Sequence, residues 1–172
     1  MRPPHPRPGL GALALTAAGL WLLLGGGERA ARNAAERPSS VNARVVEVVD
    51  GDTARMLVGG DEESVRYIGI DAPESAIPGH EPECFGKAAT RVNRRLVAGE
   101  LVRLRFGRER RDDYGRLLAY VHAGATFVNA ELIRRGYART LKIAPNDDRA
   151  PLFARLQQRA ANAGRGLWGA CS

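Results

Sequence analysis

The sequence predicts an α+β domain in which five short strands form a Greek-key β-barrel and three α-helices pack against it. Three observations support this fold class. Five short segments between residues 44 and 122 are rich in β-branched residues or alternate between apolar and charged residues. One helical apolar period interrupts these segments after the third of them. Two further helical periods follow the fifth segment.

The first three strands are expected over residues 44–50, 53–58 and 64–70. Each segment is short and rich in Val or Ile, and turn residues separate them, with Asp50-Gly51 after the first and Gly59-Gly60 after the second. Strands joined by such short turns are antiparallel neighbours, so we expect a meander. An Asp-Gly pair in this position is, by itself, an ordinary hairpin turn.

An amphipathic helix is expected after the third strand, because apolar residues recur there at helical spacing and Gly99 is placed to end the helix. Its apolar positions are Phe85, Ala88, Ala89, Val92 and Leu96. The fourth strand is expected over 101–106, where apolar residues alternate with arginines, and the fifth over 116–122. Five strands with a helix between the third and the fourth match a small barrel of the oligonucleotide-binding (OB) type.

Two C-terminal helices complete the predicted domain. The first covers residues 128–135 and is closed by Gly136. The second covers residues 151–163, is opened by Asp147-Asp148 and is closed by Gly164. The sequence shows no internal repeat and no coiled-coil pattern, so we expect one domain.

Residues 1–27 predict a membrane-targeting segment, which is either a signal peptide or a membrane anchor. Basic residues precede an uncharged stretch from Gly9 to Gly27, which is intermediate in character between a signal-peptide core and a segment that spans a bilayer. No clear Ala-x-Ala site follows, which favours an anchor with its basic end inside. Residues 28–42 lack a sustained apolar period and are expected to be a flexible linker. The folded domain is therefore placed at 43–172.

Export would make the domain extracytoplasmic, either secreted or held at the membrane by its N-terminal segment. It would also make Cys84 and Cys171 candidates for one disulfide, because an oxidising compartment lets such a bond persist. Two free thiols are the alternative, since the sequence does not give the distance between them.

The net charge of +7 favours a polyanionic partner. Most of the basic residues are arginines. Nucleic acid and an anionic membrane surface would both satisfy this charge, so the charge ranks partners without choosing between them.

Acidic residues and arginines alternate along the chain in a pattern that packing does not explain. The motifs are Asp50-Gly-Asp-Thr53, Arg66, Asp71-Ala-Pro-Glu74 and Asp113-Tyr-Gly-Arg116. The carboxylates are hard oxygen donors with no Cys or His pair at zinc spacing, which favours Ca²⁺ or Mg²⁺. The arginines suit a phosphodiester, whose transition state gains negative charge on its equatorial oxygens. A carboxylate that does not bind the metal could activate water as a general base.

These motifs resemble the thermonuclease family, typified by staphylococcal nuclease, over residues 43 to 169. The resemblance lies in Asp50–Thr53, in Arg66-Tyr-Ile-Gly-Ile-Asp-Ala-Pro-Glu74 and in Asp113-Tyr-Gly-Arg-Leu-Leu-Ala-Tyr120. It implies a five-stranded barrel with three helices. It also implies Ca²⁺-dependent hydrolysis of DNA and RNA, including single-stranded DNA, to products that end in a 3′-phosphate. We expect a monomer.

The resemblance also implies a metal site. Asp52 and Asp71 resemble the calcium ligands, and the backbone carbonyl of Ala72 is a further donor. Asp50 resembles a carboxylate that holds this site in place. The family type has a threonine where this chain has Ala72, a difference that removes a hydroxyl but leaves the carbonyl donor.

The resemblance assigns the chemistry to three further residues. Glu74 resembles the general base, and Arg66 and Arg116 resemble the two arginines that stabilise the transition state. Tyr114 resembles the tyrosine that contacts a nucleotide phosphate.

Two departures from the family pattern affect substrate binding rather than hydrolysis. Asp113 replaces the lysine that precedes the phosphate-binding tyrosine, and residues 140–145 lack the tyrosines that flank the base pocket. Because stacking contributes about 1–3 kcal/mol per base, we expect weaker nucleotide binding and an altered base preference.

Two other functions explain part of the pattern. A non-catalytic OB-fold module would use the barrel to bind nucleic acid, but binding alone would tolerate loss of the acidic residues, which repel phosphate unless a cation neutralises them. A basic domain that docks on anionic lipid explains the charge and the N-terminal segment, but not Asp71-Ala-Pro-Glu74. A Ca²⁺-dependent nuclease is therefore the leading hypothesis.

Overall fold

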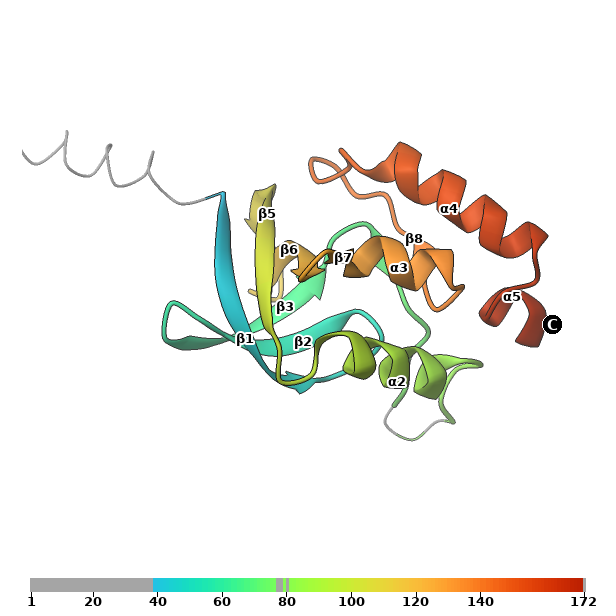
Figure 1. Cartoon of the computed structure of the whole chain (residues 1–172), viewed down its shortest axis with the longest axis horizontal. Coiled ribbons are helices and arrows are strands. Elements are labelled where there is room, and N and C mark those ends of the chain that lie inside the picture. Colours follow the sequence, from blue (N-terminus) through green and yellow to red (C-terminus); the bar gives the residue numbers. More distant parts are fainter. Residues whose placement is uncertain (1–38, 77–78, 80, 172) are drawn as a thin grey trace, which may run out of the picture. The chain divides into compact units, whose positions relative to one another are not determined.

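The computed structural model describes residues 39–76, 79 and 81–171, in which a closed β-barrel carries helices on one side (Figure 1). Five long strands hydrogen-bond in the order β3-β2-β1-β5-β6, and a parallel pairing of β3 with β6 closes the barrel. These strands are β1 (Ser40–Val48), β2 (Thr53–Val58), β3 (Asp61–Tyr67), β5 (Leu101–Arg111) and β6 (Leu117–Ala123). Together with three covering helices, they confirm the predicted α+β fold, a five-stranded OB-type barrel.

The barrel interior is filled by side chains that alternate inward along the strands. On β5, Val102 and Leu104 are fully buried, whereas Arg103 and Arg105 between and beside them are exposed. A β-bulge after Val45 of β1 shifts the register against β2. Since burying one such apolar side chain contributes about 1.5–3 kcal/mol, this interior is a major source of stability.

Three helices cover the barrel as predicted, and the described part of the chain ends in a fourth, shorter one. They are α2 (Gly86–Val97), α3 (Val128–Arg134), α4 (Ala150–Asn162) and α5 (Leu167–Ala170). Helix α3 lies between the barrel and α4 (Figure 1). The buried Phe153 of α4 has its ring centroid 6.4 Å from that of Tyr120 on β6, so the apolar core extends from the barrel into the helical layer.

Several strand boundaries differ from the prediction, because strand pairing and turns in the folded chain set them. β1 begins at Ser40, inside the predicted linker, since residues 40–42 pair with residues 103–105 of β5. β3 ends at Tyr67, because a turn with Gly69 at φ 80° separates it from β4 (Ile70–Asp71). β5 continues to Arg111 beyond a register shift against β6.

Three two-residue strands were not predicted. β4 pairs with β8 (Arg139–Thr140), which ties the second acidic motif to the segment before α4. β7 (Thr126–Phe127) pairs with β6 and leads directly into α3. Segments of two residues carry no period, so the sequence pattern could not reveal them.

The predicted targeting segment, residues 1–27, and most of the predicted linker, residues 28–42, lie outside the described residues. A signal peptide or anchor therefore stays a prediction. Where the structure describes the chain, its helices are too short or too polar to cross a bilayer.

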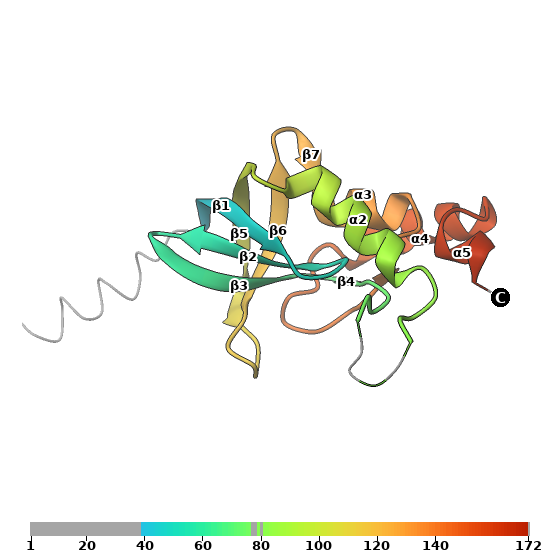
Figure 2. The ribbon, with the colours of Figure 1, turned by 90° about the horizontal axis from the view of Figure 1, so that it is seen from below.

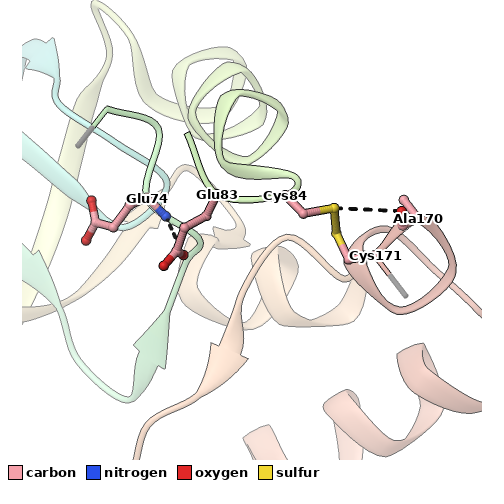
Figure 3. The surroundings of a disulfide bond; sticks show 5 residues. All are labelled: Glu74, Glu83, Cys84, Ala170 and Cys171. Carbon is pink, nitrogen blue, oxygen red and sulfur yellow. Dashed lines mark hydrogen bonds between the residues drawn. A yellow bond between two sulfur atoms is a disulfide. The ribbon is translucent and has the colours of Figure 1, made fainter. Parts of the chain in front are cut away.

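A disulfide joins the segment that enters α2 to the C-terminal end of the domain. Cys84 and Cys171 are bonded, with their Cα atoms 5.9 Å apart (Figure 3). Cys84 lies just before α2 and Cys171 follows α5, and the two regions lie side by side (Figure 2). Of the two alternatives that the sequence left open for these cysteines, the structure has the disulfide.

Candidate active site

The first acidic motif forms the turn between β1 and β2. Asp50 folds back on this turn, where its Oδ1 accepts the backbone N–H of Asp52 at 2.9 Å. The fully buried Asn93 of α2 donates from Nδ2 to the backbone carbonyl of Asp50 at 2.9 Å. Burial raises the pKa of the Asp50 carboxyl, and the nearby Arg66 guanidinium opposes that rise. A helix thus fixes this turn, which is more than a simple hairpin connection.

Asp52 lies at the centre of the site and is only 3% exposed. Its Oδ2 accepts the backbone N–H of Ala72 at 2.6 Å, which links the first acidic motif to the second. Its Oδ1 forms an ion pair with Arg66, which lies opposite Thr53 in the pairing of β2 with β3. Nη2 of Arg66 also donates to Oδ1 of Asp71 at 2.9 Å. One guanidinium therefore bridges both predicted calcium ligands.

The residues around Arg66 fit a hard cation. Two carboxylates converge on one positive group, and the backbone carbonyl of Ala72 adjoins Asp71. In residues 39–76, 79 and 81–171, no set of three or more Asp, Glu, His and Cys side chains is arranged to hold a metal. A Ca²⁺ bound here would complete its usual six to eight oxygen ligands with water. Calcium binding by this chain stays a prediction.

Glu74 is held by its backbone. Its N–H donates to Oε2 of Glu83 at 3.0 Å (Figure 3). The N–H of Glu83 donates to the carbonyl of Glu74 at 3.0 Å. Gly86, at the start of α2, allows this approach, because a Cβ there would collide with the Glu74 carbonyl oxygen. Burial raises the pKa of the Glu74 carboxyl, with Asp50 adding to the rise. A raised pKa brings a carboxylate closer to the strength that a general base needs near neutral pH.

Arg116, the second predicted catalytic arginine, is held by Asp112. Its Nε donates to Oδ2 of Asp112 at 2.7 Å, and its backbone N–H donates to Oδ1 at 2.9 Å. Burial would raise the pKa of Asp112, but the hydrogen bonds from Arg116 outweigh it and lower that pKa. The guanidinium carbon of Arg116 lies 5.3 Å from the ring centroid of Tyr114, a side chain that is 85% exposed. Tyr114 is thus placed on the surface beside the arginine.

Arg66, Tyr114 and Arg116 all line one cleft of about 310 Å³. Leu141 and Ile143 form part of its wall. Residues 140–145, which lack the tyrosines of the family's base pocket, therefore reach this cleft, but they line it with the aliphatic side chains of Leu141 and Ile143. Asp113, in place of the family's lysine, also lines the cleft and adds a negative charge beside Tyr114.

The structure brings the predicted residues together in two groups that share Arg66. Asp52 and Asp71 form ion pairs with Arg66. Asp50 and Glu74 lie near enough for the charge of Arg66 to oppose the rise of their pKa values that burial causes. Arg116 and Tyr114 share the cleft with Arg66, whereas the four acidic residues do not line it.

Sequence reasoning missed three supporting residues of this site, namely Asn93, Glu83 and Asp112. None of them lies in the acidic and arginine motifs. Asn93 and Glu83 bind residues that are 43 and 9 positions away in the sequence, and Asp112 binds a residue four positions away. The aspartate directly before Asp113 was the one available signal, because an Asp can bond the backbone N–H groups of a turn that follows it.

Comparison with known proteins agrees with this geometry. A family model described as Staphylococcal nuclease homologue matches residues 64–170. The Thermonuclease of Staphylococcus intermedius is 37% identical over 124 residues, which cover 72% of this chain and 74% of that protein. The Endonuclease YncB of Bacillus subtilis (strain 168) is 33% identical over 130 residues, which cover 74% of this chain and 62% of that protein. This chain therefore belongs to the thermonuclease (staphylococcal nuclease) family and is a nuclease, a hydrolase of phosphodiester bonds.

Proposed function

We propose that this chain is an exported, Ca²⁺-dependent nuclease that hydrolyses DNA and RNA, including single-stranded DNA, to products that end in a 3′-phosphate. The observation that carries the proposal is the position of Arg66, which contacts two carboxylates and also lines the cleft that contains Arg116. Acidic groups, arginines and an open cleft are together the parts that phosphodiester hydrolysis needs.

Two arginines would stabilise the transition state. A phosphodiester in the cleft would accept hydrogen bonds from the guanidinium groups of Arg66 and Arg116, which bind paired oxygens bidentately. These contacts strengthen as charge develops on the equatorial oxygens, so they lower the barrier more than they improve substrate binding.

Glu74 would act as the general base. Its carboxylate takes a proton from a water molecule, and the water oxygen forms a bond to phosphorus while the bond from phosphorus to O5′ breaks. The departing O5′ takes up a proton from solvent, which leaves a 5′-hydroxyl on one product and a 3′-phosphate on the other. The backbone contacts between Glu74 and Glu83 would hold the base in place for this step.

Asp52, Asp71 and the carbonyl of Ala72 would hold the Ca²⁺, and Asp50 would keep Asp52 in position through its backbone N–H. When bound, Ca²⁺ polarises a phosphoryl oxygen and offsets negative charge. Tyr114, exposed at the mouth of the cleft, would contact a phosphate next to the one that is cleaved.

We further propose that the domain acts outside the cytoplasm as a monomer, secreted or held at the membrane by residues 1–27. The disulfide between Cys84 and Cys171 supports this location, because such bonds persist in oxidising compartments and are rare in the cytosol. The basic character of the chain suits a polyanionic substrate in either case.

The experiment that tests the proposal is to incubate the purified chain with single-stranded DNA in millimolar Ca²⁺, with and without a chelator, and to analyse product length and end groups. We expect cleavage that stops on chelation and leaves 3′-phosphate ends. Salt-sensitive DNA binding without cleavage in any divalent ion would instead indicate a non-catalytic OB-fold binding module. Products with 5′-phosphate ends would refute the proposed bond cleavage.

A further inference from the structure

A second recess lies on the outer face of the barrel. It has a volume of about 450 Å³ and shares no lining residue with the cleft described above. Its lining residues are Arg105, Phe106, Tyr120, His122, Phe127, Asp148, Arg149 and Leu152. Nothing in the proposed hydrolysis uses these residues.

The strand register places arginines and aromatic rings together at this recess. Arg103 lies opposite His122, and Arg105 lies opposite Tyr120, in the pairing of β5 with β6. His122 in turn lies opposite Phe127 of β7. Because side chains alternate along a strand, these partners all stand on the outer face, away from the buried Val102 and Leu104.

Three arginines near the recess have no carboxylate partner within the described residues, namely Arg103, Arg105 and Arg149. All three are close enough to His122 to lower its pKa, after the larger effect of burial. The one acidic residue in the lining, Asp148, is already paired with Arg108 at 3.2 Å. Unpaired like charges that cluster repel one another, so this arrangement favours an anionic ligand.

Aromatic rings form the other part of the recess, with His122 and Phe127 half-buried and Tyr120 buried. His122 stacks on Phe127, with ring centroids 4.6 Å apart and an interplanar angle of 11°. Tyr120 meets Phe127 edge-on at 5.9 Å. Arginines beside a stacked aromatic pair are the combination that binds single-stranded nucleic acid, since the arginines contact phosphates and the rings contact bases.

The recess continues the line of the cleft. Leu118 lines the cleft, and Tyr120 and His122 line the recess, two and four residues further along the same face of β6. At about 3.3 Å per residue, Leu118 and His122 are roughly 13 Å apart along the strand. A strand of nucleic acid whose scissile phosphate lies in the cleft could therefore reach this recess. Binding to an anionic membrane would not require the recess to be aligned with the cleft, so this alignment favours nucleic acid as the ligand.

We propose that this recess is a second subsite for single-stranded nucleic acid, in which Arg105 and Arg149 contact a phosphate of the bound strand and His122 and Phe127 contact a base. The proposal rests on nucleic acid being the substrate, and it does not depend on the metal or on Glu74. It predicts that affinity depends on the length of the strand.

The test measures binding without turnover, in the full chain carrying Glu74→Gln. Fluorescence anisotropy would compare a 12-nucleotide single-stranded DNA with a two-nucleotide one. Adding Arg105→Gln and Arg149→Gln should weaken binding of the long strand at least 10-fold and that of the short one less than twofold. For the long strand, the slope of log K against log salt should fall by about 0.7, because the two arginines together contact one phosphate and each phosphate contact on single strands contributes about 0.7.

A matched control replaces two arginines of α2, Arg94→Gln and Arg95→Gln, which are exposed and line neither the cleft nor the recess. If this control weakens the long strand equally, the effect is one of total charge and the proposal is wrong. Equal losses of affinity for both strand lengths would also overturn it. So would a result in which the Arg105 and Arg149 substitutions weaken binding to vesicles of anionic lipid, measured in parallel, and leave binding of both DNA strands unchanged. Because the test measures binding and not cleavage, its result can be interpreted even if the proposed nuclease mechanism is wrong.

A second measurement uses the chain without changes in the recess. A 12-nucleotide strand that carries photoreactive bromodeoxyuridine should crosslink to Tyr120, His122 or Phe127 of the recess, as located residue by residue with mass spectrometry. Adducts confined to the cleft residues would contradict the proposal.

Discussion

Removing the disulfide should destabilise the domain and also impair catalysis. The perturbation is Cys84→Ser with Cys171→Ser, in which the sulfurs are replaced by small hydroxyls. Cys84 is exposed, so little apolar burial is lost at that end, and the main effect is on the chain entropy of the unfolded state. The bond closes a loop with a sequence separation of 87 residues.

The length of the loop that the disulfide closes determines how much stability is lost when the bond is removed. The chain-entropy relation gives about 4.6 kcal/mol at 25 °C for a loop of this length, near the upper end of the 2–5 kcal/mol typical of native disulfides. A domain of about 130 residues has an unfolding entropy of about 0.27 kcal/mol/K near its midpoint. A loss of about 3 to 4.6 kcal/mol should therefore lower Tm by about 11 to 17 °C.

Thermal unfolding followed by circular dichroism, on the oxidised chain and on the double serine variant, measures this shift. A change of less than about 2 °C would refute the reasoning. It would mean either that the unfolded chain gains little conformational freedom when the disulfide is removed, or that other contacts hold together the segments that carry Cys84 and Cys171.

Catalysis should fall as well, at temperatures well below both midpoints. Cys84 adjoins Glu83, whose side chain accepts the N–H of Glu74 (Figure 3). The backbone N–H of Glu83 also donates to the carbonyl of Glu74. Glu83→Ala with the disulfide intact should lower kcat and leave KM nearly unchanged, because it loosens the base without touching the cleft. Glu83→Gln should restore most of the activity, since its amide oxygen accepts the same N–H. Loss of stability with full kcat would separate the disulfide from the active site.

Three further changes test other parts of the structure. Glu74→Gln should lower kcat by about 10² or more while DNA binding persists, because it removes the general base; unchanged turnover would exclude that role. Arg116→Ala should reduce kcat/KM by at least as much, since it removes a bidentate contact to the transition state, and near-normal activity would show that another group makes it. Hydrogen bonds from Arg134, opposed by burial and aided by Arg135, lower the pKa of Glu131 to about 2. The stability that Glu131 contributes is therefore present above its unfolded pKa near 4.5 and is lost as pH falls towards 2. Glu131→Gln should cost about 1 kcal/mol at pH 7, because the arginines are half exposed and solvent weakens the pairs. Urea unfolding should show this cost shrinking between pH 4.5 and 2, and a constant cost would contradict the assignment.

The barrel could be predicted because its strands carry local signals. The alternation of Val102 and Leu104 with arginines marks one buried face, and Asp50-Gly51 marks a turn. The extension of β5 to Arg111 could not be predicted, because residues 107–111 are one glycine and four charged residues with no alternation. Pairing with β6 forms that part of the strand.

The motif residues of the site could be predicted from the sequence, whereas the residues that hold them in place could not. Asp52, Arg66 and Asp71 lie in motifs whose chemistry is evident from residue type and order. Glu83 and Asp112 lie outside these motifs, and only the folded chain shows which groups they bind. The sequence pattern gives no signal for Glu83, which binds the backbone of Glu74. For Asp112 the only signal is its position before a turn whose backbone N–H groups it can bond.

The ion pairs of Arg66 imply a link between cation and substrate binding. A buried carboxylate without a partner costs several kcal/mol, so Asp52, at 3% exposure, needs either Arg66 or a cation. A cation that takes Asp52 and Asp71 would free donors of Arg66 for phosphate. Linkage is reciprocal, so a nucleotide should raise Ca²⁺ affinity by the same factor, about fivefold or more, by which Ca²⁺ raises nucleotide affinity.

Calorimetric titration of Ca²⁺ into the Glu74→Gln chain, with and without a dinucleotide, measures this factor. Adding Arg66→Gln removes the competitor for both carboxylates, so Ca²⁺ alone should bind more tightly while the effect of the nucleotide disappears. If the nucleotide effect survives in that variant, Arg66 does not couple the two ligands. Its ion pairs with Asp52 and Asp71 would then serve only to stabilise the fold in the absence of the metal.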